Sequence, residues 1–235
     1  MKIDTDRVKN KKFTEPIKAN ILKHSQEYRV LATLRYLFPT KYKTMITGEA
    51  PDIQDTVNSV GIEVTAAVKE NDMKVSRAFS EMCQNEEKGT EKQKKIINSS
   101  GYSFIPIKND KVAISTMGIS DGEKIFFQES IKRKIKKLQQ YRSAFDIMGL
   151  AVLLPEIPTS EAESLFIDWI KEVFQKYEDA FDFVYVISHR FYILYDAKRN
   201  SSEKHSISTE EDCLLRTIAR MTAEEELSLK DQEWN

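Results

Sequence analysis

The sequence predicts an α/β protein in which helices and strands follow one another in mixed order. Segments with the helical period alternate with short β-branched or aromatic segments of strand length. The continuous apolar run at 149–154 is typical of a central strand that is buried on both faces. The chain has 235 residues, of which 40% are hydrophobic, so it can bury one large core or two small ones.

The N-terminal part begins with a predicted amphipathic helix over 13–38, with Thr14 as its N-cap and Pro39 as its stop. Two short strands follow at 43–47 and 60–65, joined by a polar segment. Because side chains alternate along a strand, Ile62 and Val64 point to one face, and Glu63 and Thr65 to the other.

The middle of the chain predicts a helix, a hairpin and a second helix. Residues 72–98 carry a thin apolar stripe, which Gly89 divides into two helices. The strands 102–107 and 111–116 flank Asn-Asp and form a hairpin. Residues 123–142 form the clearest amphipathic helix, with one apolar face and lysines and arginines over the rest.

The C-terminal part predicts a buried strand, a helix, two aromatic strands and a last helix. Ser160 and Glu163 form a capping box at the start of the first of these helices. The predicted segments, in this order, are 149–154, 160–177, 181–188, 191–195 and 208–229.

Composition narrows the class of protein. The N-terminus has no apolar core of a secretory signal, and the longest uncharged apolar run, 148–155, is too short for a membrane helix. Cys83 and Cys213 cannot form a disulfide scaffold. We therefore expect a cytoplasmic protein with no membrane partner.

The formal net charge of −1 hides an uneven distribution. From Glu203 onward nine acidic and four basic residues give the end of the chain a net charge of −5, which leaves +4 for the rest. We predict one domain over 1–198 and an acidic, helical C-terminal tail over 199–235. The split weakens the argument from near-neutrality against a nucleic-acid partner without reversing it, and uneven surface charge without function explains the same numbers.

Several common catalytic motifs are missing from the sequence. It has no G-x-x-x-x-G-K-[ST] or G-x-G-x-x-G loop for phosphates. Its three histidines are scattered and neither cysteine belongs to a C-x-x-C pair, which disfavours zinc and Cys–His chemistry. Any catalysis must then use carboxylates, lysines and a hard cation.

Two carboxylates stand out as a candidate metal site. Asp52 follows Pro51 in a turn, and Glu63 lies in the next strand. Acids on neighbouring strands can converge on one Mg²⁺, which prefers oxygen ligands. A Pro-Asp pair is also an ordinary turn signal, so the pattern alone does not decide.

Pro51-Asp52 together with Glu63-Val64-Thr65 resembles the motif of the PD-(D/E)XK nuclease superfamily, over about residues 15–155. The resemblance implies a restriction-endonuclease-like fold: a mixed central sheet flanked by helices, here with an inserted hairpin and a C-terminal helix. It implies that Asp52 and Glu63 hold Mg²⁺ or Mn²⁺, joined by an acid of the first helix. Glu27 matches that position, although a solvated helix residue is the plainer interpretation.

The sequence departs from the superfamily at the lysine of the motif, where it has Thr65. Thr65 cannot supply a positive charge, although its hydroxyl could orient a water. In some members the lysine lies on the helix behind the sheet, which here offers Lys132 or Lys136, and Lys69 is a further candidate. We take Asp52, Glu63, Thr65 and Lys136 as the candidate catalytic residues.

The resemblance implies a metal-dependent nuclease, with DNA as the favoured substrate. The lysine-rich helix would contact phosphates through Lys132, Arg133, Lys136 and Lys137, although a solvated helix face explains these residues as well. An inactive nucleic-acid-binding module on the same fold, and a protein-interaction or regulatory protein, remain alternatives. The choice between DNA and RNA and the formation of a homodimer are left open.

Overall fold

The structure is a computed structural model that describes most of the chain. The described residues are 5–15, 17–67, 74–75, 77–79, 81–82, 90–106, 112–116, 121–154 and 162–229. They form two compact units. The larger unit comprises the described residues up to 11, those of 17–67 and those from 127 onward. The smaller unit comprises the described residues of 12–16 and 68–126. In the described part of the chain, no helix is long and apolar enough to cross a membrane.

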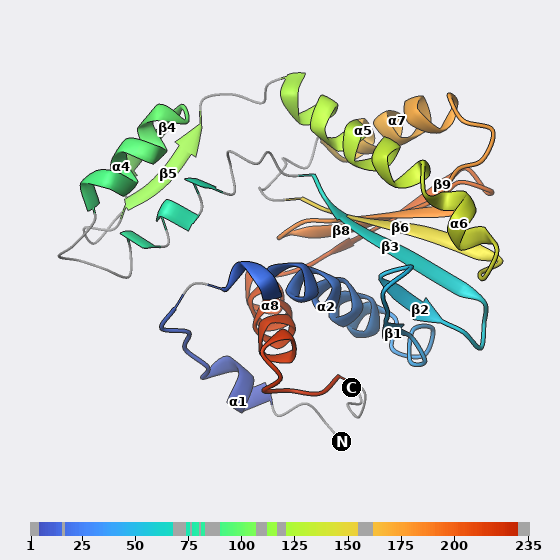
Figure 1. Ribbon diagram of the computed structural model, residues 1–235, viewed down its shortest axis with the longest axis horizontal. Helices are drawn as coiled ribbons and strands as arrows, with labels where there is room; N and C mark the ends of the chain where they lie inside the picture. The colour runs from blue at the N-terminus through green and yellow to red at the C-terminus, as the bar shows by residue number, and fades with distance from the viewer. Residues whose placement is uncertain are drawn as a thin grey trace. The chain divides into compact units, whose positions relative to one another are not determined.

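The larger unit is built on a mixed seven-stranded sheet (Figure 1). Its strands, in spatial order, are β1 (Ile46–Thr47), β2 (Ile53–Asp55), β3 (Val60–Ala66), β6 (Ile147–Leu153), β7 (Phe183–Ile187), β8 (Phe191–Asp196) and β9 (Ser201–Ser206). The three central strands β3, β6 and β7 are parallel, and every other pair is antiparallel. With helices on both sides of this sheet, the predicted α/β class is confirmed.

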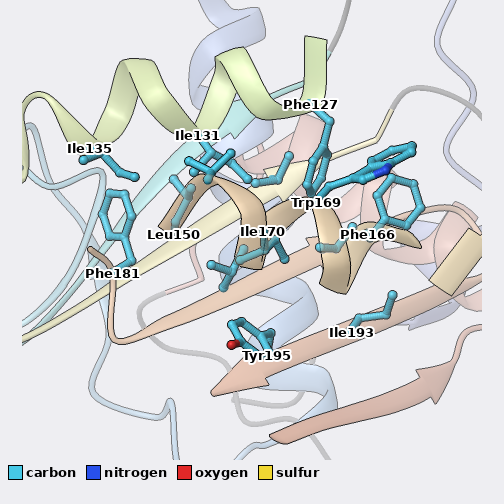
Figure 2. Close-up of a cluster of buried hydrophobic side chains, with 14 of the residues drawn as sticks. Phe127, Ile131, Ile135, Leu150, Phe166, Trp169, Ile170, Phe181, Ile193 and Tyr195 are labelled. Atoms are coloured by element: carbon cyan, nitrogen blue, oxygen red, sulfur yellow. The ribbon is translucent and has the colours of Figure 1, made fainter. Parts of the chain in front are cut away.

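One face of the sheet is covered by three helices: α5 (Asp121–Ile135), α6 (Leu138–Arg142) and α7 (Ala162–Phe174). Figure 2 shows Phe127 and Ile131 of α5 close to Phe166 and Ile170 of α7, above the sheet. These side chains are fully buried and pack with the apolar side chains of β6, β7 and β8. This core holds the part of α5 from Phe127 onward in place over β3 and β6.

The opposite face is covered by α2 (Ala19–Leu37) and α8 (Thr209–Ala223), which pack against each other (Figure 1). The short helix α1 (Thr5–Lys9) contacts α8. Arg29 of α2 forms an ion pair with Asp212 of α8 at 2.9 Å. The tyrosines Tyr185 and Tyr192 are buried on this side of the sheet, with ring centroids 5.1 Å apart.

The smaller unit contains the predicted hairpin. It consists of α4 (Thr90–Ser99), β4 (Tyr102–Pro106) and β5 (Val112–Thr116), and the two strands are antiparallel. Val75, Ala78, Ile97 and Tyr102 form its buried core. The chain is helical at 74–75, 77–79 and 81–82, within the predicted segment 72–98, while Gly89 lies outside the described residues.

The structure corrects several predicted boundaries at the N-terminal side. The first helix begins at Ala19 rather than at 13, because the backbone of Lys18 is extended and its carbonyl accepts the first helical hydrogen bonds. Thr14 is therefore not its N-cap. The segment between the first two predicted strands contains the additional strand β2, which pairs with both β1 and β3.

The helix predicted over 123–142 is two helices, α5 and α6. The amide of Lys137 donates to the carbonyl of Lys134 at 3.0 Å, three residues back, so the helix tightens and turns at this point. The turn lets Leu138 and Tyr141 of α6 bury their side chains. The predicted start at Ser160 lies outside the described residues.

The region 199–235, predicted as a tail, contributes β9 and α8 to the larger unit. β9 pairs with β8 along its whole length and forms an edge of the sheet. The predicted C-terminal helix is present as α8, which begins after a capping box between Ser208 and Glu211. The sheet and its covering helices therefore continue past residue 198, the predicted end of the domain.

Candidate functional site

Asp52 lies where the chain enters β2, next to the middle of β3. Gly61 of β3 makes this approach possible, since a Cβ there would lie only 2.5 Å from Cγ of Pro51. The backbone amide of Val64 donates to Oδ2 of Asp52 at 2.8 Å. The carboxylate is therefore fixed against β3 in a buried position.

Glu63 projects from β3 toward the face that carries α5 and α6. It is only 2% exposed, as are Asp52 and Glu27. The register of the parallel pair places it beside Leu150 of β6, which belongs to the apolar core on that face. Glu63 is thus an acid in a row of apolar side chains, and such a buried charge requires polar partners.

Tyr141 of α6 is one partner of Glu63. Its side chain is hydrogen-bonded to the Glu63 carboxylate. Burial, followed by the negative charge of Glu63, raises the pKa of the Tyr141 hydroxyl above its ordinary value. Tyr141 therefore stays protonated and remains a hydrogen-bond donor to Glu63 across the neutral pH range.

Lys134 of α5 is the second partner, and it links the two acids. Its ammonium donates to Oε2 of Glu63 and lies 3.4 Å from Oδ2 of Asp52. The Lys134 side chain is only 16% exposed. A largely buried ammonium thus stands beside both acids.

Lys134 is not among the residues predicted from the sequence, whereas its neighbours Lys132, Arg133 and Lys136 are. The helical spacing of the apolar residues could have identified Lys134. It lies seven residues after the buried Phe127, three after the buried Ile131 and four before the buried Leu138. Lys134 therefore lies on the apolar stripe of the helix. A cation on such a stripe is best placed to reach a buried acid.

Glu27 of α2 joins the site from the other side of Asp52. The ammonium of Lys23 lies 3.1 Å from Oε1 of Glu27 and 3.4 Å from Oδ1 of Asp52. Nδ1 of His24 lies 3.0 Å from Oε2 of Glu27. The hydrogen bond with Glu27 and the charge of Asp52 raise the pKa of Lys23, which therefore carries a full positive charge at neutral pH.

Thr65 lies two residues beyond Glu63 and is buried. The guanidinium of Arg133 donates to its hydroxyl at 3.3 Å. Arg133 is itself exposed, so it connects the buried site to the surface.

The other lysines that we predicted for this helix lie away from the acids. Lys132 forms an ion pair with Glu129 at 2.8 Å, which lowers the pKa of Glu129. Lys136 and Lys137 are exposed in the turn between α5 and α6. Lys69 lies outside the described residues.

The side chains around the two lysines carry oxygens of the kind that a hard cation binds. Glu27, Asp52 and Glu63 are buried carboxylates, and Oε1 of Glu27 lies 3.1 Å from the ammonium of Lys23. Carboxylate oxygens are the ligands that Mg²⁺ and Mn²⁺ prefer. Among the described residues no three acids, histidines or cysteines are grouped closely enough to hold a metal as they stand. Two ammoniums, those of Lys23 and Lys134, lie between these carboxylates.

Comparisons with protein-family models, with curated proteins and with solved structures gave no match for this chain.

Proposed function

We propose that the protein is a metal-dependent nuclease of the PD-(D/E)XK type, with a restriction-endonuclease-like sheet and with DNA as the favoured substrate. The observation that carries the proposal is the buried contact of Lys134 with both Asp52 and Glu63. Lys134 on α5 supplies the positive charge that Thr65 on β3 cannot provide. Two acids and a lysine in mutual contact are the side chains that hydrolysis of a phosphodiester by this route needs.

The order of the elements supports the same proposal. An acid on the first long helix, an acid before one strand and an acid within the next strand are linked by two lysines, Lys23 and Lys134. A helix packed over the sheet then supplies the lysine. We propose Glu27, Asp52 and Glu63 as the residues that would hold Mg²⁺ or Mn²⁺.

When bound, such an ion stabilises negative charge on the phosphate and makes water a stronger nucleophile at neutral pH. The chain's own groups do the rest. Lys134 neutralises and orients the Glu63 carboxylate, and its remaining N–H groups can hold a water or a phosphate oxygen. Tyr141 gives the Glu63 carboxylate a second hydrogen-bond partner, from α6.

Arg133 is the residue best placed to meet the backbone of the nucleic acid. It is exposed while its guanidinium contacts Thr65, two residues from Glu63. A planar guanidinium suits a phosphate group, with which it can form two parallel hydrogen bonds. Lys136 and Lys137 are exposed farther along the same region and would add sequence-independent contacts.

The test is incubation of the purified protein with plasmid and with short single- and double-stranded DNA and RNA, in Mg²⁺ or Mn²⁺. The proposal predicts cleavage by the wild type that is lost in Glu63→Gln and Asp52→Asn, both of which keep the side-chain size. Cleavage that persists in these variants would refute the site assignment.

The same experiment separates the alternatives. Salt-sensitive binding without cleavage would favour an inactive nucleic-acid-binding module, the candidate favoured by Thr65 in the lysine position. Neither binding nor cleavage would favour a protein-interaction or regulatory role.

A further inference from the structure

The two lysines of the site differ in how firmly they are held. The Lys134 side chain is 16% exposed, whereas that of Lys23 is 67% exposed. Lys23 nevertheless places its ammonium against Glu27 and Asp52, which are both almost completely buried. One cation is therefore built into the core, and the other reaches the acids from the surface.

Glu27, Asp52 and Glu63 are buried carboxylates, and buried charges need compensating charge. In the protein without a metal, Lys134 forms ion pairs with Asp52 and Glu63, and Lys23 forms ion pairs with Glu27 and Asp52. Asp52 is shared, with Oδ1 facing Lys23 and Oδ2 facing Lys134. A divalent ion with carboxylate ligands would thus meet an ammonium already in contact with two of its three proposed ligands.

We propose that Lys23 is a tethered counter-cation, which competes with the metal for Glu27 and Asp52 and turns to the phosphate of the nucleic acid when the metal binds. This inference rests on the proposed function. Lys23 can make the exchange because most of its side chain is exposed and its flexible stem is anchored on α2, one helical turn before Glu27. The buried Lys134 stays beside Glu63.

Such an exchange couples the two ligands of the enzyme. The metal has to displace Lys23 when it binds alone, and the displaced ammonium then becomes a partner for a phosphate. Because the coupling of two ligands is reciprocal, metal would strengthen binding of the nucleic acid, and nucleic acid would strengthen binding of the metal. Because of Lys23, the site would therefore bind the metal more tightly when nucleic acid is bound than when it is not.

The test measures Mn²⁺ binding to the full chain by isothermal titration calorimetry, in the absence of nucleic acid. Lys23→Gln removes the competing ammonium, and we expect it to bind Mn²⁺ roughly two- to tenfold more tightly than the wild type, the range expected for exposed ion pairs. Lys18→Gln is the matched control, since it removes an exposed charge from the same end of α2 and should change the affinity less than about twofold. Lys23→Arg keeps the charge and should stay near the wild type.

A second measurement tests the release toward phosphate. Fluorescence anisotropy of a short labelled duplex, with and without Ca²⁺, gives the gain in DNA affinity that the cation causes. We expect this gain to be smaller in Lys23→Gln than in the wild type and in Lys18→Gln. An unchanged gain would overturn the coupling.

These measurements distinguish a wrong role for Lys23 from the absence of a metal site. If the wild type binds Mn²⁺ and Glu63→Gln does not, while Lys23→Gln binds no more tightly than Lys18→Gln, the counter-cation role is refuted and the metal site stands. If the folded wild type and all variants fail to bind Mn²⁺, both are refuted. Thermal unfolding of each variant shows that the compared proteins are folded.

Discussion

The ammonium of Lys134 on α5 donates a hydrogen bond to the carboxylate of Glu63 on β3, across 71 positions of the sequence. The same ammonium reaches Asp52 at 3.4 Å. This contact joins the helix over the sheet to two acids on neighbouring strands. It is the structural reason for treating a site with threonine in the lysine position as a candidate catalytic site.

Replacing Lys134 by glutamine should reduce cleavage by about a hundredfold or more, since a positioned charged group in such a site contributes on this scale. The matched control is Lys176→Gln, which removes an exposed lysine just after α7 that has no role in the proposed site, and it should retain activity within about twofold. Cleavage rates under single-turnover conditions measure both. Comparable losses in the two variants would contradict the role of Lys134.

The loss of Lys134 also leaves Asp52 and Glu63 with less compensating charge, so the variant should be less stable. Urea unfolding of Lys134→Gln checks that the assay is made on folded protein. Lys134→Met, which removes the charge as well but keeps an unbranched apolar side chain, should be equally inactive. An active Lys134→Met would show that the ammonium is dispensable.

Gly61→Ala should move Asp52 away from β3. The added Cβ would lie 2.5 Å from Cγ of Pro51 and 2.7 Å from Sδ of Met148, so the backbone of β3 or both of these side chains must shift. We expect a loss of about 1–3 kcal/mol in the free energy of unfolding, as for other overpacked sites. Gly48→Ala is the control, because its Cβ would meet only the end of the flexible Gln54 side chain and should cost less.

Tyr141 contributes a part of the free energy of unfolding that is lost at alkaline pH. The pKa of its hydroxyl is raised by burial and by Glu63, so it lies above the unfolded value of about 10. The stabilisation is complete below that unfolded value and is lost as the pH rises through the folded one. Unfolding free energies at increasing alkaline pH should therefore fall less steeply in Tyr141→Phe. Tyr185 and Tyr192, whose pKa values burial also raises, contribute equally to both proteins. Identical slopes would contradict this assignment.

Asp182 should control part of the acid stability. Burial alone would raise its pKa, but the amide of Met148 at 2.7 Å and the cations Lys198 and Arg142 outweigh it and lower the pKa. The stabilisation is present above the unfolded pKa of about 4 and is lost as the pH falls through the folded value. Asp182→Asn should be less stable at neutral pH and less sensitive to acid. A full acid dependence in this variant would refute the assignment.

The elements with strong periodicity could be predicted from the sequence. The run 149–154 is the buried strand β6, and the alternation around Glu63 is β3. The short strand β2 was missed because three residues are too few to show a period, and β9 was missed because its residues are polar and exposed. Both strands are defined by their pairing partners rather than by their own sequences.

The acids of the candidate site could be named from the sequence, while their lysine could not be identified by the motif. Asp52 and Glu63 stand on adjacent parts of a hairpin, so their proximity follows from local pairing. Lys134 meets them only through the packing of α5 on the sheet, and that packing depends on the whole core. Lys132 and Lys136 were predicted because they lie one turn apart on the helix behind the sheet, whereas burial of Phe127 and Ile131 turns Lys134 toward the acids.

The most direct test of the central claim is a crystal structure of the protein with Mn²⁺, measured with anomalous scattering. The account predicts an anomalous peak bounded by the carboxylates of Asp52 and Glu63, with Lys134 still beside Glu63. A fully folded crystal with no anomalous peak at these carboxylates, at an Mn²⁺ concentration that supports cleavage in solution, would contradict it.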